Sequence, residues 1–320
     1  MSLYAKISWD YTLCQEKDME GKCMKNGSLS RGWAELLLAG VITARSTSYL
    51  FSKLILAGMG VFNLLGVRFI LASAILIVLF FKRLRHINRR SFVAGVIMGC
   101  MFFLVMAAEL SGLKRTSSGN ASFLVNTAIV LVPLLQAVLK HCLPRRNVIL
   151  SCILSLAGVA CLKLGSGVNI GTGEVFCLLA AFLYACTIIM TDRLAHGGID
   201  TLAAGIIQVC VIGVLSLTSG IIFEEPRLPS GTLEWSAIIM LAVVCTGFGF
   251  TLQPVAQSKT TAERAGMFCA LNPLVATALG IVFLHEQFTV QSAIGGAFIL
   301  AGILIAELPE TKDRKKEITA

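Results

Sequence analysis

Charged residues are scarce in this chain. Only 14% of its 320 residues are Asp, Glu, Lys or Arg, whereas 56% are hydrophobic, and the mean hydropathy is +0.81. This balance is far from that of a soluble globular domain. The composition therefore predicts an integral membrane protein, and the long apolar runs described below predict that it is all-α.

The sequence also lacks the patterns that most often carry chemistry. None of the eleven cysteines forms a C-x-x-C pair, which disfavours a disulfide framework or a zinc site. There is no H-E-x-x-H, no G-x-S-x-G and no G-x-x-x-x-G-K-[ST] phosphate loop, and the four histidines are scattered. We therefore expect no catalytic residue, no metal and no cofactor, and no direct use of ATP.

Apolar runs of about 20 residues, the length that crosses a ~30 Å hydrocarbon core, repeat along the chain. They predict ten transmembrane helices, at 33–57, 61–81, 92–112, 119–139, 147–164, 173–191, 201–222, 235–255, 265–284 and 289–306. Residues 1–32 and 307–320 are expected to be polar tails, the second one basic. The first tail lacks the pattern of a cleaved signal peptide, and Met24 is an alternative start.

The positions of Lys and Arg predict an orientation. With ten spans both termini share one side, and the tails and loops of that side hold twenty Lys and Arg residues, against Lys114, Arg115 and Arg227 on the other. Because cytoplasmic loops are rich in Lys and Arg, we expect both termini in the cytoplasm, with the chain in the inner membrane of a bacterium. No basic helix lies outside these loops, so nucleic acid is not an expected partner.

The two halves of the chain echo each other. The stretch TSSGNASFLVNTAIVLVPLLQAVL (116–139) is similar in pattern to TTAERAGMFCALNPLVATALGIVFL (260–284), and each is followed by a short link and an apolar run that contains Ala-Gly. Five segments per half predict repeats over 33–165 and 173–306, the second inverted in the bilayer relative to the first. Inverted repeats are the plan of many secondary transporters, which expose a central site to each side in turn.

Several motifs stand in a fixed order over these halves. They are Lys53 late in the first segment, Arg68-Phe69 in the second, GLKRTSSGNASFLVNTAIVLVP (112–133), AQSKTTAERAGMFCALNP (256–273) and LHEQFTVQSAIGGAFILAGILI (284–305). In this order and spacing the chain from Trp33 to Ala306 resembles the EamA-type branch of the drug/metabolite transporter superfamily.

The resemblance implies a secondary active transporter of small metabolites, with export as the default direction. An uptake permease of the same fold and a membrane-embedded enzyme are the alternatives. The chain departs from the family pattern at two places: Arg45-Ser46 stands where the family often has Trp-Gly, and Asn272 where it often has Glu before a proline.

The stretch TARSTSYLFSK (43–53) places an arginine deep inside an apolar segment. On a helix, Arg45, Ser48, Tyr49 and Ser52 fall on one face, while Thr47 points away. A guanidinium suits a carboxylate or a phosphate, so the face predicts a cavity lining in which Arg45 binds an anionic group, such as the carboxylate of an amino acid. The alternative is that Arg45 is a structural post that caps helix carbonyls or pairs with an acid.

Glu109, Lys53 and Arg68 lie near the ends of their segments and should share the outer layer of the membrane. One interpretation is a salt bridge of Glu109 with Arg68 or Lys53. The other is that Glu109 carries protons, because a desolvated carboxylate can titrate near neutral pH.

Uncharged polar residues deep in other segments could bind the substrate or link helices. They are Asn126, Tyr184, Gln208, Gln253 and Asn272. Gly95 and Gly99 have the G-x-x-x-G spacing that marks close helix packing. The expected partners are a small-molecule metabolite and the lipid bilayer, with the protein acting as a monomer or a homodimer.

Overall fold

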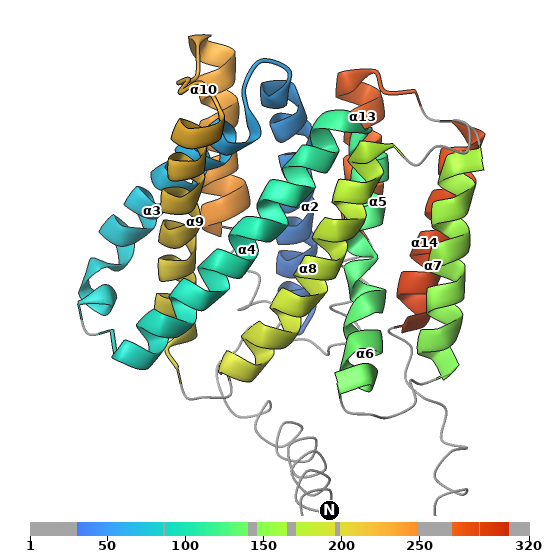
Figure 1. Cartoon of the computed structure of the whole chain (residues 1–320), viewed down its shortest axis with the longest axis horizontal. Coiled ribbons are helices and arrows are strands. Elements are labelled where there is room, and N and C mark those ends of the chain that lie inside the picture. Colours follow the sequence, from blue (N-terminus) through green and yellow to red (C-terminus); the bar gives the residue numbers. More distant parts are fainter. Residues whose placement is uncertain are drawn as a thin grey trace, which may run out of the picture.

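The computed structural model describes residues 31–85, 87–139, 146–164, 171–195, 199–248, 271–287 and 289–306, and within them every regular element is a helix. The helices stand side by side in one bundle (Figure 1). The expected tails, apart from Arg31 and Gly32, and the candidate Gln253 lie outside the described residues.

Helices occur at the positions of all ten expected segments. The first half of the chain forms α2 (Arg31–Leu56), α3 (Val61–Leu84), α4 (Arg89–Arg115), α5 (Ser118–Asn126), α6 (Ala128–Leu139) and α7 (Arg146–Leu164). The second half forms α8 (Thr172–Ala195), α9 (Thr201–Phe223), α10 (Gly231–Met240), the π-helix η1 (Leu241–Phe248), α13 (Leu271–Leu284) and α14 (Val290–Ala306).

Five stretches of the described residues are long and apolar enough to cross a membrane. They are Val61–Leu84, Arg89–Arg115, Ser118–Leu139, Thr172–Thr191 and Leu202–Phe223. The chain is thus a multi-pass, all-helical membrane protein, and the count of ten spans stays a prediction.

Two of the expected segments are not uniform α-helices. The segment 119–139 is divided at Thr127, whose hydroxyl donates to the Leu124 carbonyl at 2.6 Å, and α6 contains Pro133, which has no backbone N–H to donate. The segment expected at 235–255 begins earlier, at Gly231, and changes at Leu241 into a π-helix. Hydropathy does not report either change, because both depend on individual backbone hydrogen bonds.

Helices α3 and α9, the second helix of each half, run antiparallel in contact along their length. At one end the backbone N–H groups of Phe62 and Asn63 donate to the Glu224 carboxylate, at 3.1 and 2.9 Å. At the other end Arg83 pairs with Asp200 at 2.8 Å, and its hydrogen bonds hold the pKa of the Asp200 carboxyl below its usual range. We call these the Gly58 end, after the α2–α3 turn at the top of Figure 1, and the basic end, after the α3–α4 link.

Many contacts between the described helices recur when the two halves of the chain are exchanged. The equivalent helices α3 and α9, α5 and α13, and α7 and α14 pack against each other. The packing of α4 on α8 matches that of α10 and η1 on α2, and the packing of α2 on α13 matches that of α8 on α5 and α6. The described helices of the two halves thus have similar packing partners.

Close approach of α4 to α9 depends on two glycines. A Cβ atom on Gly99 would lie 2.6 Å from Val211 Cβ, and one on Gly95 would lie 2.7 Å from the Ala204 carbonyl oxygen. Neither position has room for a side chain, so the close packing predicted from the G-x-x-x-G spacing is confirmed. Small residues at such contacts are the usual means of bringing membrane helices together.

We expect Gly99→Val to lower the melting temperature of the detergent-purified protein by roughly 2–10 °C, because overpacking a tight contact costs ~1–3 kcal/mol. Gly205→Val on α9 is the matched control, since a Cβ there meets no atom within 4 Å. Thermal unfolding of both variants measures the difference. Equal melting temperatures would contradict the assigned role of Gly99.

Candidate substrate cavity

A cavity of about 300 Å³ lies among α2, α4, the α5–α6 junction, α8 and α13. The lining residues of α2, α4 and α8 lie well inside these helices, whereas those of α5, α6 and α13 lie at the helix ends that meet the cavity. The polar residues that line it are Arg45, Tyr49, Glu109, Asn126, Tyr184 and Asn272, and the apolar ones are Ile42, Phe102, Val105, Met106, Val125, Ala128, Ile129 and Ile188. The cavity is thus apolar in most of its wall, with a few polar groups facing inward.

All six polar residues of this wall are candidates named from the sequence, although they come from five different helices. The structure brings them together. The other candidates, Ser48, Ser52, Gln208, Lys53 and Arg68, are not among the residues that line the cavity. The substrate-binding role of each residue stays a prediction.

The polar face of α2 divides between two surroundings. Arg45 and Tyr49, one turn apart, face the cavity. The Ser48 hydroxyl instead accepts a hydrogen bond from Arg68 Nη1 at 3.3 Å, and Ser52, two turns beyond Arg45, is fully buried. Thr47 turns to η1, where its hydroxyl lies 3.5 Å from Cys245 Sγ. The helical period alone groups the first four residues, but which neighbour each one meets depends on tertiary packing.

Arg68 has hydrogen-bond partners other than the acid expected for it. It is 4% exposed, its Nε donates to Thr246 Oγ1 at 2.9 Å, and its guanidinium carbon lies 5.4 Å from the centre of the Phe69 ring. Thr246 belongs to the π-helix, so the wider turn of η1 presents a hydroxyl to this arginine. Among the described residues no ion pair joins Arg68 to Glu109.

Lys53 caps the end of α4. Its Nζ donates to the carbonyls of Leu113 and Thr116, at 2.6 and 2.5 Å. Cations are favourable at helix C-termini, where carbonyl groups lack partners within the helix. In the part of the chain that the structure describes, Lys53 forms no ion pair with Glu109, so the structure gives it a helix-capping contact.

Glu109 meets α2 inside the cavity. Its carboxylate interacts with the Tyr49 hydroxyl, and the charges of Arg45 and Arg68 both act on it. The cavity wall therefore contains an acidic residue, Glu109, and a basic residue, Arg45. Sequence reasoning proposed Glu109 and Tyr49 separately and missed their contact, because it joins different helices.

Two asparagines of the wall also serve the packing. Asn272 Oδ1 accepts a hydrogen bond from the Ser46 hydroxyl at 2.7 Å, which joins α13 to α2. Asn126 Nδ2 donates to the Ser122 carbonyl at 2.7 Å, within α5. Ser46 was not proposed from the sequence, and its place beside Arg45 in the unusual Arg45-Ser46 pair is the signal that could have indicated it.

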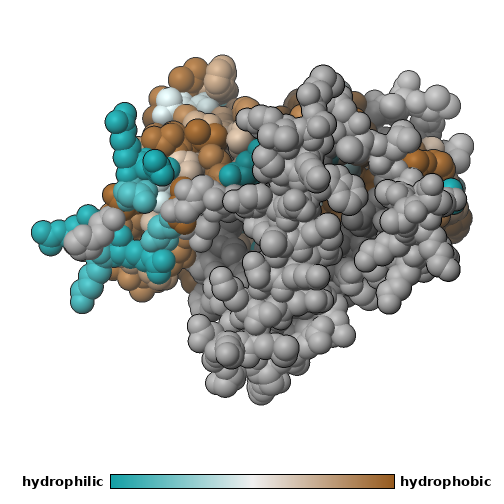
Figure 2. Space-filling model, turned by 90° about the horizontal axis from the view of Figure 1, so that it is seen from below, coloured by the Kyte–Doolittle hydropathy of each residue, from teal (hydrophilic) through white to brown (hydrophobic). Residues whose placement is uncertain are grey.

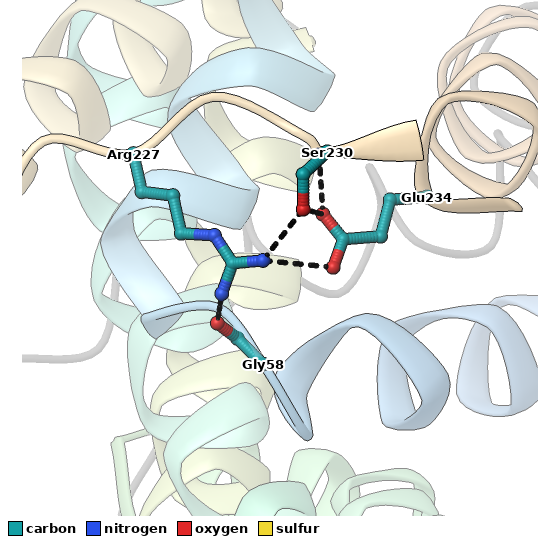
Figure 3. Close-up of polar contacts among 4 residues, drawn as sticks. All are labelled: Gly58, Arg227, Ser230 and Glu234. Atoms are coloured by element: carbon teal, nitrogen blue, oxygen red, sulfur yellow. Dashed lines mark hydrogen bonds and ion pairs between the residues drawn. The ribbon is translucent and has the colours of Figure 1, made fainter. Parts of the chain in front are cut away.

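Arg227 ties the two halves together at the Gly58 end (Figure 3). Its guanidinium donates to the Gly58 carbonyl, to Ser230 Oγ at 2.8 Å and to Glu234 at 3.1 Å. Glu234 also accepts from the Ser230 backbone N–H at 2.7 Å. The α2–α3 turn is therefore linked to the start of α10 by one side chain, which sequence reasoning treated only as a topological charge.

A second tie at this end joins α5 to the residues after α13. Glu286 accepts hydrogen bonds from the Ser118 backbone N–H and from the Ser118 hydroxyl, the latter at 2.7 Å. A carboxylate at the first turn of a helix is stabilised by the unpaired N–H groups there. With Glu224 at the start of α3, the second half supplies an acid to the N-terminus of two helices of the first half.

Comparison with known proteins identifies this arrangement. A model of the EamA-like transporter family matches residues 32–164 and, separately, residues 171–308. The chain belongs to the EamA-like transporter family. The double match confirms both the resemblance stated from the sequence and the presence of two EamA repeats.

Relatives of this EamA-family protein extend over most of its length. A Bacillus subtilis (strain 168) protein named uncharacterized transporter YetK is 25% identical over 284 residues, 85% of this chain and 86% of its own. An uncharacterized transporter of Archaeoglobus fulgidus is 27% identical over 286 residues, 84% of this chain and 96% of its own. A protein of known crystal structure, 22% identical, matches 87% of this chain and 97% of its own with a TM-score of 0.62, which supports the fold.

We expect Lys53→Met to lower the melting temperature of the purified protein, because two helix-end carbonyls lose a charged donor, at ~1.5–3 kcal/mol for such a hydrogen bond. Lys53→Arg should recover most of the loss. Lys114→Met, which changes an exposed lysine on the last turn of α4, is the control. Thermal unfolding curves compare them; a Lys53→Met curve that overlays the control would exclude the capping role.

Proposed function

We propose that this EamA-family protein is a secondary active transporter that moves a small carboxylate-bearing metabolite, such as an amino acid, by alternating access. The observation that carries the proposal is the cavity in which Arg45 meets Tyr49, Glu109, Asn126 and Asn272. Such a group of polar side chains in the middle of an apolar bundle is expensive to maintain, and it marks substrate and ion pathways in membrane proteins.

The chemistry of the cavity matches an amino acid. A guanidinium binds a carboxylate through two parallel charge-assisted hydrogen bonds, and the Glu109 carboxylate complements an ammonium group. The apolar wall, which includes Phe102, Val105 and Ile129, offers contact to an aliphatic or aromatic side chain. A volume near 300 Å³ is at the small end of ligand pockets, which favours a small metabolite.

The arrangement of the halves supports alternating access. Equivalent helices such as α3 and α9 run antiparallel, as two copies inverted in a bilayer would, and the cavity is lined from both halves. This symmetry is compatible with ten spans in the cell membrane and with both termini on the cytoplasmic side. We propose export as the direction, with the Gly58 end on the outer side.

A panel of amino acids and related carboxylates, assayed by counterflow in proteoliposomes of known orientation, tests the proposal. At least one carboxylate should exchange across the membrane, and its amide should not. Transport of neutral compounds alone would overturn the assignment of the substrate class.

For a compound found in this way, we expect Arg45→Lys to weaken binding about tenfold or more. Lysine keeps the charge but cannot form two parallel hydrogen bonds to a carboxylate, and a charged hydrogen bond contributes ~1.5–3 kcal/mol. The ligand-induced rise in melting temperature measures binding. Ser52→Ala, on the same helix but outside the cavity wall, is the control. A full ligand-induced shift in both Arg45→Lys and Arg45→Gln would remove Arg45 from the site.

For the orientation, we expect Thr232→Cys and Arg85→Cys, each in a background without native cysteines, to label oppositely. Both residues are exposed and lie at opposite ends of the bundle. A membrane-impermeant maleimide added to intact cells should modify Thr232→Cys alone. Labelling of Arg85→Cys alone would invert the proposed orientation, and labelling of both would contradict the ten-span topology.

A further inference from the structure

Three arginines converge on a second cavity, at the basic end of the bundle. Arg89 and Arg90 belong to the first turn of α4, and Arg193 to the last turn of α8. The cavity that they line has a volume of about 560 Å³ and is separate from the central one. All three side chains are exposed, and within the described part of the chain no hydrogen bond or ion pair engages them.

The rest of this cavity is apolar. Its other lining residues are Val93, Ala94, Ile97, Leu194 and Ile199. Val93 and Ile97 are 46% and 38% exposed, although they lie on α4 within a stretch long and apolar enough to cross a membrane. Exposed aliphatic side chains on a membrane-spanning helix are suited to contact with lipid tails, so the cavity combines three cations with a wall that suits hydrocarbon.

Figure 2 shows this end of the molecule from below. Hydrophilic side chains gather at the edge over the α3–α4 link, directly beside hydrophobic surface. Positive charge at the membrane surface next to a hydrocarbon-facing wall is complementary to a molecule with an anionic head and an apolar tail.

We propose that this cavity is a binding site for an anionic phospholipid of the leaflet at the basic end. The lipid phosphate binds the guanidinium groups of Arg89, Arg90 and Arg193, and an acyl chain lies along Val93 and Ile97. Arginine matches phosphate oxygens by its fork of donors, and the N-terminus of α4 adds partial positive charge beside Arg89 and Arg90. Basic pockets between membrane helices on the cytoplasmic side are suited to anionic headgroups.

The general excess of cations on one side of the membrane does not account for this arrangement. The orientation of a chain in the membrane requires only that Lys and Arg lie near the cytoplasmic surface. Arg89, Arg90 and Arg193 instead come from two helices of different halves and line one cavity. Lys82, at the same end of the bundle, is exposed and lies outside it. Arg83, by contrast, is held by Asp200. Because α4 belongs to the first half and α8 to the second, one bound lipid would contact both halves.

Native mass spectrometry of the detergent-purified chain, titrated with phosphatidylglycerol or with phosphatidylcholine of the same acyl chains, tests the proposal. The wild-type protein should retain phosphatidylglycerol preferentially. At about fivefold per arginine, from ~1 kcal/mol each near a lipid surface, the variant R89Q/R90Q/R193Q should bind phosphatidylglycerol on the order of a hundredfold more weakly. Lys82→Gln, which removes one charge outside the cavity, should stay within about twofold of wild type.

Two further arms keep the test decisive. If the triple variant does not fold, Arg193→Gln alone should weaken phosphatidylglycerol binding about fivefold. Glycerol 3-phosphate, a headgroup without acyl chains, should bind far more weakly than the lipid. Equal retention of both lipids, equal losses in Lys82→Gln and the arginine variants, or binding of glycerol 3-phosphate as tight as the lipid's would each overturn the proposal.

Discussion

The structure depends on the need to satisfy charged groups inside an apolar bundle. An unpaired charge in such surroundings costs several kcal/mol, so each buried or partly buried cation must find acceptors among its neighbours. Lys53 uses the carbonyls at the end of α4, and Arg68 uses hydroxyls of α2 and η1. These contacts join α3, α4 and η1 to one another and to α2, whereas Arg45 faces the cavity that α2 and α4 line with α5, α6, α8 and α13. One wall of the cavity is thus formed by α4, which the contact of Lys53 joins to α2.

Much of the fold follows from patterns that the sequence shows directly. Apolar runs locate the helices, and the echo between residues 116–139 and 260–284 indicates the two halves, which the family match confirms. The division at Thr127 and the π-helix at Leu241 could not be read in the same way. Each depends on one or two hydrogen bonds, and a hydropathy averaged over many residues does not detect such local changes in the backbone.

The candidate site could likewise be predicted only in part from the sequence. Helical period places Arg45 and Tyr49 on one face, and both line the cavity. The helical period does not show which helix lies opposite each residue. It therefore groups Ser48 with Arg45, although in the structure Ser48 contacts Arg68. It also gave no sign of the contact between Glu109 and the Tyr49 hydroxyl, which stands beside the charge of Arg68, one of the partners expected for Glu109. Arg227 and Glu286 were missed as ties because loop residues have no periodicity from which to infer a partner.

The antiparallel pair of α3 and α9 has a consequence for how the halves can move. Gly66 lies against Leu217, Gly213 against Ile70 and Gly220 against Asn63, so one register holds along the pair. Glu224 and Arg83 fix it at both ends. If α3 slid along α9 by one helical turn, about 5.4 Å, both end contacts would break. The glycines would also lose the neighbours against which they fit. A small rotation about the long axis of the pair would keep these contacts, so the packing of α3 against α9 favours rotation of the two halves over sliding.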